Sequence, residues 1–394
     1  MMYCPNRITP YILSLSVTPI IDAIAGQAAE ADRLRRVSAD VITALKQNDI
    51  MRFTASENLG GLNKNCTTVA RELEVIAANC ASTAWCLWNH LCTFHLFCGL
   101  LGPRNHQFLA GVTERREWVC FPAGASSAVR GVIDEDVIKI TGKAAFGSGA
   151  RYAEWAGVAF VVDDKPQFSL VNLAQEGVEI QDDWHSMSLR ASATDTVVYK
   201  DATIPLDRVV DFPFMYRIPF RDPERDMIHS RYREDWVALS DLWLGAMAVG
   251  VTQSALDEVT HGLRGRIAIM GVKIAERPTV HVNLGQANAL IQAARDHVAT
   301  TLAETDERLS NQQIPTESDY LRQLSASMMA LQLCEEAMQL MLRVMGGNGL
   351  RQGPSFERRF RDLQAMPLHI NAHRDRVSEQ SGRHLLGLDT ENPF

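Results

Sequence analysis

The chain has 394 residues, of which 46% are hydrophobic and 22% charged, and its formal net charge is −8 at pH 7. This is the composition of a globular protein, with enough length for more than one core. No basic run offsets the acidic balance, which argues against a nucleic-acid partner. The longest apolar stretches fall short of the ~20 residues of a membrane helix. Residues 11–17 are apolar but lack a cationic flank and a cleavage site, so we expect no signal peptide and a cytoplasmic location.

The eight cysteines form no C-x-x-C pair, so we expect no zinc site. Four of them recur every six residues from Cys80 to Cys98. Six helical residues turn through about 600°, so these side chains do not share one helix face. The pattern indicates buried, reduced thiols that pack as small apolar groups.

Residues 18–115 are predicted to be helical. Thr18-Pro19 is a capping residue followed by a proline, which suits the first turn of a helix. A nearly all-apolar helix over residues 84–101 ends at Gly102-Pro103, and a helix that is apolar on every side belongs in the interior. An earlier buried stripe, with apolar residues three and four apart, consists of Leu34, Val37, Val41 and Leu45.

The pattern changes to short β-rich runs between Trp118 and Val210, separated by turn residues. Short strands at such spacing are typical of a small antiparallel sandwich or barrel. The predicted strands are 118–121, 137–141, 156–162, 168–173 and 196–199.

Helical periodicity returns after residue 235, and Gly346–Gly349 predicts a sharp end to the third of these helices. The order helices, strands, helices predicts an α+β fold with an N-terminal helical domain (1–116), a middle antiparallel β domain (117–230) and a C-terminal four-helix bundle (231–394). Long bundle helices often form subunit contacts, so we expect a homo-oligomer. The predicted C-terminal helices are 235–264, 279–310, 317–346 and 365–386.

A glycine-rich segment, Gly142–Gly149, follows a predicted strand. Glycines let the backbone approach a flat ligand closely, and the Ser148 hydroxyl and nearby N–H groups could then reach polar ring atoms. On motif strength alone the alternative, a glycine-rich β turn, is favoured.

Two further segments carry ligand-binding residue types. Residues 184–195 hold an aromatic, a cation and several hydroxyls, although a polar connection between strands would read the same way. Gly346–Gly349 precedes an arginine-dense stretch that runs to Arg383. Such a stretch suits a phosphate or an acidic partner surface, with solvated faces and salt bridges as the alternative.

The histidines allow several interpretations. His369 and His373 are four residues apart, which places them on one face of the predicted helix, but the glutamate of H-E-x-x-H is missing and no third ligand cluster is evident. We therefore favour His369 as a general base or hydrogen-bond donor over a metal ligand, with a structural role still open. His90 and His95 lie in the apolar helix, where core histidines are the default, although either could line a pocket.

No G-x-S-x-G elbow, Walker loop or Rossmann fingerprint occurs, which disfavours a nicotinamide cofactor. The segments in their order resemble the acyl-CoA dehydrogenase superfamily over nearly the full chain. Met270–Arg277 is similar to the segment before the second bundle helix, and Gly346–Gly349 with Arg361-Asp362 is similar to the family's glycine turn and Arg-Asp pair. The resemblance implies flavin bound between the β domain and the C-terminal helices, usually in a tetramer.

Two features separate the chain from the dehydrogenase branch. Many acyl-CoA dehydrogenases have a catalytic glutamate shortly after the Arg-Asp pair, whereas Leu363–Asn371 contains no acid to remove a thioester α-proton. Pro122–Ala125, Gly142-Lys143 and Phe146–Gly149 are similar to the pattern of the two-component flavin monooxygenases, and His369-Ile370 matches the histidine of that branch.

The resemblance therefore implies a flavin-dependent monooxygenase. It would receive reduced FMN or FAD from a separate reductase and use O2, through a C4a-hydroperoxyflavin, to hydroxylate a small aromatic or heteroaromatic substrate. An FAD-dependent acyl-CoA dehydrogenase or oxidase, or a non-enzymatic binding protein, is the alternative. The residues it implies are His369 and Ser148 for catalysis, Phe146, Gly147, Ser148, Gly149, Arg266, Gly346, Gly347, Asn348 and Gly349 for the flavin, and Trp88, His90 and His95 for the substrate, with no metal and with a homotetrameric assembly.

Overall fold

The structure is a computed structural model that describes residues 15–123, 129–212, 220–268, 271–353 and 355–390. Some residues used above lie outside these ranges. They are Cys4, residues 11–14, Gly124-Ala125 and Met270.

The N-terminal helices differ from the prediction at one turn. The stripe from Leu34 to Leu45 is not one helix: Arg35 adopts a left-handed conformation with φ 54°, and the Ser38 side chain then accepts from Val41 N to cap a new helix. Leu34 is accordingly 54% exposed rather than buried. The elements are η1 (Thr18–Ile20), α2 (Ile21–Leu34), α3 (Ala39–Gln47), α4 (Cys66–Asn79), α5 (Ala81–Leu101) and α6 (His106–Glu114).

Among the described residues, eight strands form one sheet, in the order β6-β7-β3-β2-β4-β5-β8 with β1 beside β4. The pairs are antiparallel except β1–β4 and β2–β4, which are parallel. Five strands were predicted, whereas β2, β6 and β8 were not. The strands are β1 (Val119–Cys120), β2 (Arg130–Asp134), β3 (Val137–Gly147), β4 (Trp155–Val162), β5 (Lys165–Asn172), β6 (Val178–Gln181), β7 (Asp195–Pro205) and β8 (Val210–Asp211).

The three long C-terminal helices are confirmed to within one or two residues, but the predicted helix 365–386 is wrong over its first part and right only from residue 374 on. Pro367 lies in a short 3-10 turn, and a new helix begins only at Arg374. His369 and His373 therefore share no helix face and are not placed as a metal-binding pair. The elements are α8 (Trp236–Leu263), α9 (Pro278–Ser310), α10 (Glu317–Met345), η11 (Gly346–Leu350), α11 (Ser355–Ala365), η12 (Met366–Leu368) and α12 (Arg374–Leu385).

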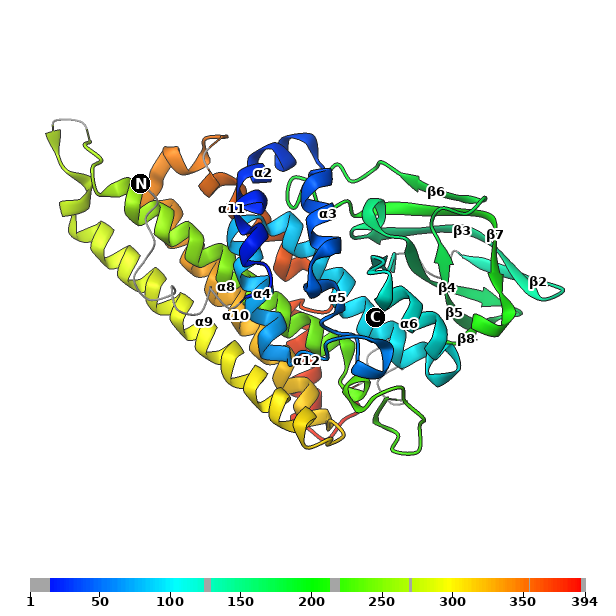
Figure 1. Ribbon diagram of the computed structural model, residues 1–394. Helices are drawn as coiled ribbons and strands as arrows, with labels where there is room; N and C mark the ends of the chain where they lie inside the picture. Colours follow the sequence, from blue (N-terminus) through cyan, green and yellow to red (C-terminus); the bar gives the residue numbers. More distant parts are fainter. Residues whose placement is uncertain (1–14, 124–128, 213–219, 269–270, 354, 391–394) are drawn as a thin grey trace.

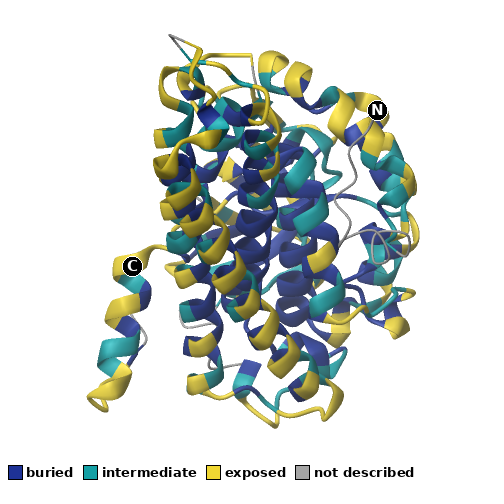
Figure 2. Ribbon diagram, turned by 90° about the vertical axis from the view of Figure 1, so that its left-hand side faces the viewer, coloured by how far each residue is buried: buried dark blue, intermediate teal, exposed yellow. Residues whose placement is uncertain are grey.

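The long helices lie side by side at one end of the molecule and the sheet lies at the other (Figure 1). Helix α5 lies between them and contacts both α8 and β1. Nearly every α5 residue is buried, as its all-apolar sequence predicts. Buried residues likewise gather along the inward faces of the bundle (Figure 2). No helix in the described ranges is both long and apolar enough to cross a membrane.

Candidate active site

Ser148 lies in the turn after β3 and is hydrogen-bonded to helix α5. Its hydroxyl accepts a hydrogen bond from Trp85 Nε1 at 2.9 Å and lies 3.0 Å from Thr194 Oγ1. Thr194 Oγ1 is in turn 2.6 Å from Ser192 Oγ. Because all four side chains are buried, the hydroxyls satisfy one another and hold the glycine-rich segment against the loop before β7.

The turn around Ser148 depends on unusual backbone angles. Phe146 has φ 62°, at an irregularity in the pairing of β3 with β7, and Gly149 has φ 77°. A Cβ on Gly149 would lie 3.2 Å from Trp118 Nε1, so both the angle and the space favour glycine. The Phe146 side chain is 61% exposed, and its ring meets the Trp184 ring edge-on at 6.4 Å.

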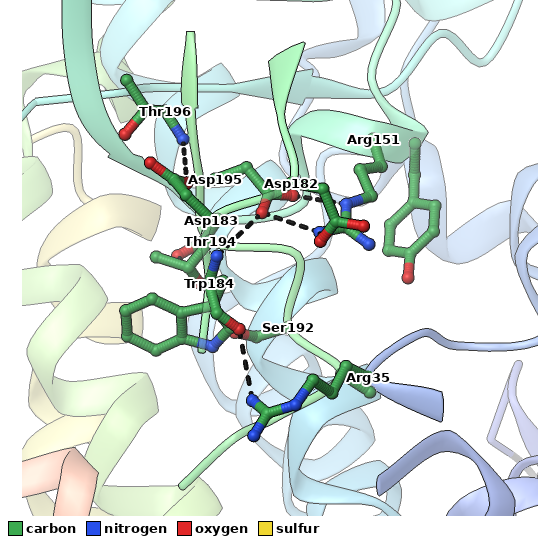
Figure 3. A network of polar contacts seen from close by, with 12 residues as sticks. Arg35, Arg151, Asp182, Asp183, Trp184, Ser192, Thr194, Asp195 and Thr196 are labelled. Atoms are coloured by element: carbon green, nitrogen blue, oxygen red, sulfur yellow. Dashed lines mark hydrogen bonds and ion pairs between the residues drawn. The ribbon is translucent and has the colours of Figure 1, made fainter. Parts of the chain in front are cut away.

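The loop from Trp184 to Asp195 is fixed by a network of ion pairs and hydrogen bonds (Figure 3). The buried Asp195 carboxylate accepts from Arg151 Nε at 2.6 Å and from Arg151 Nη2 at 2.8 Å. It also accepts from Trp184 N at 3.3 Å. Arg35, at the end of α2, donates to the Trp184 carbonyl at 3.3 Å. The loop is thus tied to both the sheet and the N-terminal helices.

Arg361 and Asp362 connect the same loop to helix α11. Asp362 Oδ1 accepts from Leu189 N at 2.7 Å, and Arg361 donates to the Met187 carbonyl at 2.6 Å and to Asp32 at 2.9 Å. Burial raises the pKa of Asp362 to about 6, against the lowering effect of the Leu189 hydrogen bond. The Arg-Asp pair therefore joins loop, helix α11 and helix α2, a role that sequence spacing did not reveal.

His369 follows η12, and its ring lies against two tryptophans of α5. The ring centroid is 5.9 Å from Trp85 and 5.2 Å from Trp88, both edge-to-face. Only 24% of the side chain is exposed, and this desolvation, with the positive charge of Arg376, lowers the pKa of His369 to about 4. The imidazole is therefore neutral at neutral pH and is able to accept a proton.

Asp241 on α8 is a site residue that the sequence analysis did not select. It is fully buried, and its Oδ1 lies 3.7 Å from His369 Nδ1. Within the described ranges, neither carboxylate oxygen of Asp241 has a hydrogen-bond partner, and neither does Nδ1 of His369. Burial raises the pKa of Asp241 well above its usual range. A usable signal was present, because Asp241 is the one acid in the otherwise apolar stretch 236–252.

His90 and His95 take structural positions. His90 Nε2 is 3.1 Å from the Met51 carbonyl and its Nδ1 accepts from Val119 N at 3.0 Å, so both ring nitrogens bind backbone groups. His95 Nε2 is 2.9 Å from the Glu234 carbonyl. His90 thus holds α5 against β1 as a core histidine, and we no longer place it among substrate-binding residues. Trp88, by contrast, does lie beside His369.

The glycine turn after α10 and Arg266 form a second group of predicted residues. Gly346 ends α10 with φ 59°, and Arg266 Nη1 donates to the Met345 carbonyl at 3.4 Å. A Cβ built on Gly346 or Gly347 would meet nothing within 4 Å, so the backbone of this turn is open to a ligand. Gly349 is different, because its Cβ would lie 2.8 Å from the Leu342 side chain, and it is a packing glycine.

Matches to known proteins cover either the C-terminal part of the chain or nearly all of it. Residues 242–374 match the family model described as "Acyl-CoA dehydrogenase, C-terminal domain". The chain is 25% identical to the oxygenase subunit HsaA of a flavin-dependent monooxygenase from Rhodococcus jostii, over 94% of this chain and 97% of the relative. It is 24% identical to the oxygenase component of an FADH(2)-dependent resorcinol hydroxylase from Rhizobium sp., over 99% and 98%.

A solved structure shows the same fold. XiaF from Streptomyces sp., in complex with FADH2 and glycerol, superposes with a TM-score of 0.85 at 22% identity, and the match covers 96% of both chains. The expected α+β architecture is therefore confirmed. Residues 242–374 thus match the C-terminal domain of the acyl-CoA dehydrogenases, and over its length the chain is similar to flavin-dependent monooxygenases.

Proposed function

We propose that the chain is the oxygenase component of a two-component monooxygenase. It takes reduced flavin from a separate reductase and uses O2 to hydroxylate a small aromatic or heteroaromatic substrate. The observation that carries the proposal is the neutral His369 held against Trp85 and Trp88, with Ser148 hydrogen-bonded to the same Trp85. The full-length similarity to the oxygenase components supports it.

The residues at the end of β3 fit a flavin. The exposed Phe146 ring offers an apolar surface, and Ser148 with its neighbouring hydroxyls offers polar contacts beside it. The open turn at Gly346-Gly347 and Asn348, with Arg266 beside it, would hold phosphate groups. When bound, reduced FAD or FMN supplies the electrons with which O2 gives one oxygen atom to the substrate and one to water.

The protein's own residues have distinct tasks in this reaction. Trp85 Nε1 fixes the direction of the Ser148 hydroxyl. His369, neutral because its pKa is lowered to about 4, accepts the proton of a substrate hydroxyl or donates to the reacting oxygen. The apolar helix α5, with Trp85 and Trp88, keeps water away from the reacting atoms.

The assembly and location belong to the same proposal. Leu385, Leu386 and Leu388 are exposed near the C-terminus, and apolar side chains of this kind are commonly covered by a partner subunit. We propose a homotetramer in the cytoplasm, where the free cysteines would stay reduced. The domain limits 1–116, 117–230 and 231–394 remain predictions.

One experiment tests the function directly. The flavin-free chain is mixed without oxygen with reduced FMN or reduced FAD, and oxygenated buffer with phenol or indole is then added. We expect flavin reoxidation at a rate different from that of free flavin, less hydrogen peroxide per flavin when a substrate is present, and a hydroxylated product by mass spectrometry. Reoxidation at the protein-free rate with no product would refute the proposal, and reduction of bound FAD by butyryl-CoA would favour a dehydrogenase.

A further inference from the structure

Three side chains on α5, α8 and the residue after η12 have buried hydrogen-bonding atoms without a partner among the described residues. They are both carboxylate oxygens of Asp241, Nδ1 of His369 and Oδ1 of Asn89. A buried polar atom without a partner is costly, and native proteins keep few of them unless a ligand or water completes the contact. The two oxygen-bearing groups can accept hydrogen bonds, so the missing partners are donors.

These groups lie where α5, α8 and η12 meet. Asn89 is one turn after Trp85 on α5, and Trp88 beside it has its ring edge against His369. Trp88 Nε1 donates to the Ser240 carbonyl at 2.7 Å, which ties α5 to the residue before Asp241. The Asp241 carbonyl accepts from Ser327 Oγ at 2.5 Å. The backbone of Asp241 is thus held from two sides.

The charged and titratable groups that face Asp241 come from several elements. Arg376 on α12 favours the carboxylate form of Asp241, whereas Asp235 at the start of α8 favours the protonated form. Cys92 on α5 is close enough for Asp241 to raise the pKa of its thiol. Arg376 also donates to Asn371 Oδ1 at 3.1 Å, so its own position is fixed.

We propose that Asp241 is the positioning residue for His369, and that together they receive an aromatic ligand carrying a hydroxyl or N–H group. The present gap of 3.7 Å between Oδ1 and Nδ1 exceeds a hydrogen bond, and such contacts often tighten only when a ligand binds. With Nδ1–H donating to Asp241, Nε2 has a free lone pair and accepts the ligand's proton. This inference rests on the proposed function, because it names the substrate class of the same site.

The arrangement has a consequence for pH. A ligand that donates a hydrogen bond needs the Asp241–His369 pair to carry a single proton, on Nδ1 of His369. A second proton would occupy either the carboxyl group of Asp241 or Nε2 of His369. Binding of a donor ligand should therefore tighten as pH rises and the pair loses that second proton. Asn at position 241 would still accept from Nδ1–H but could not titrate.

Calorimetric titration of the flavin-free chain tests the inference with phenol against anisole, and indole against 1-methylindole. We expect the donor member of at least one pair to bind about tenfold tighter than its methylated partner, which is the effect of one good hydrogen bond in a buried site. Asp241→Leu should remove this preference. Asp241→Asn should keep the preference but lose its dependence on pH between 5 and 9.

The matched control is Glu72→Gln, which alters another buried carboxylate, on helix α4. The Glu72 carboxylate accepts hydrogen bonds from Ser16 N at 2.7 Å and from Val17 N at 3.1 Å. The substitution should change neither the preference nor its pH profile. The inference fails if no pair shows a preference in the wild type, or if Asp241→Leu weakens both members equally. It also fails if the donor preference of Asp241→Asn still depends on pH between 5 and 9. This measurement remains possible if Asp241→Leu does not fold.

The outcome is separable from that of the proposed function, because the titration needs no flavin, reductase or oxygen. A chain that shows the donor preference but leaves flavin reoxidation unchanged would refute the monooxygenase and keep the binding role of Asp241. If Asp241→Leu hydroxylates a substrate as well as the wild type does, the monooxygenase is kept and the positioning role of Asp241 is refuted.

Discussion

Replacing Asp195 by Asn should destabilise the protein far more than replacing Asp182 by Asn, although both carboxylates bind Arg151 (Figure 3). Asp195 is fully buried and accepts two hydrogen bonds from the guanidinium, whereas Asp182 is 67% exposed. Removing one partner of a buried ion pair costs about 3–5 kcal/mol, since the remaining charge is left without compensation. An exposed ion pair contributes about 0–1 kcal/mol.

The exposure of Arg151 sets the size of the effect. Its side chain is 14% exposed, so water solvates part of the charge after Asp195→Asn, and Asp182 still faces it. We therefore expect the lower end of the range, about 3 kcal/mol, for Asp195→Asn and under about 1 kcal/mol for Asp182→Asn. Trp184 N keeps an acceptor in the asparagine Oδ1, so the loop's backbone bond adds little to the difference.

Urea unfolding followed by tryptophan fluorescence measures both variants. The free energy of unfolding of each variant is compared with that of the wild type at one pH. Its slope against urea concentration should be the same in all three proteins, which shows that the same transition is measured. If the two asparagine variants lose the same stability, the buried pair is not what holds the loop before β7. The reasoning would also be refuted if Asp195→Asn were neutral.

Three other predictions follow from the contacts of His369, Asp362 and Gly250. His369→Ala should lower product formation by about 10²–10⁴-fold with reduced-flavin binding unchanged, measured by product analysis and flavin titration. The pKa of Asp362 is raised to about 6 from 3.8, so the folded state binds more protons than the unfolded state, and stability should fall as pH rises between about 4 and 6. Urea unfolding at several pH values should show this slope in the wild type and not in Asp362→Asn. Gly250→Ala would place a Cβ 2.2 Å from the Glu74 carbonyl oxygen and should lower the free energy of unfolding by about 1–3 kcal/mol. Gly285→Ala in α9, where a Cβ meets nothing within 4 Å, should raise it by about 0.5–1 kcal/mol in the same assay.

Helices were predictable where apolar periodicity ran without interruption, as in α8, α9 and α10. The errors lie at breaks that periodicity does not register. Arg35 turns the chain in a left-handed conformation that non-glycine residues seldom adopt, and nothing in its residue type announces that. At Pro367 the signal was present, because proline disfavours a helix interior, and the predicted helix 365–386 ran through it.

Strands were predictable only where one face is buried. The residues of β2 are mostly exposed, including Val132 and Ile133, so its sequence shows no alternation of apolar and polar residues. It belongs to the sheet through backbone pairing with β3, from Arg130 with Thr141 to Asp134 with Val137. Such a strand is predictable from the strands that pair with it rather than from its own residues.

The site illustrates the same limit. Ser148 and His369 were each selectable from sequence, but the connection between them passes through Trp85, which hydrogen-bonds the one and packs on the other. Asp241 could be noticed as the one acid of residues 236–252, yet its relation to His369 exists only once α8 and η12 meet beside α5. A buried carboxyl group without hydrogen-bond partners costs stability whether or not it is charged. One that is retained beside a neutral histidine, with no hydrogen bond to either oxygen from the residues that the structure describes, therefore argues for a ligand rather than for the fold.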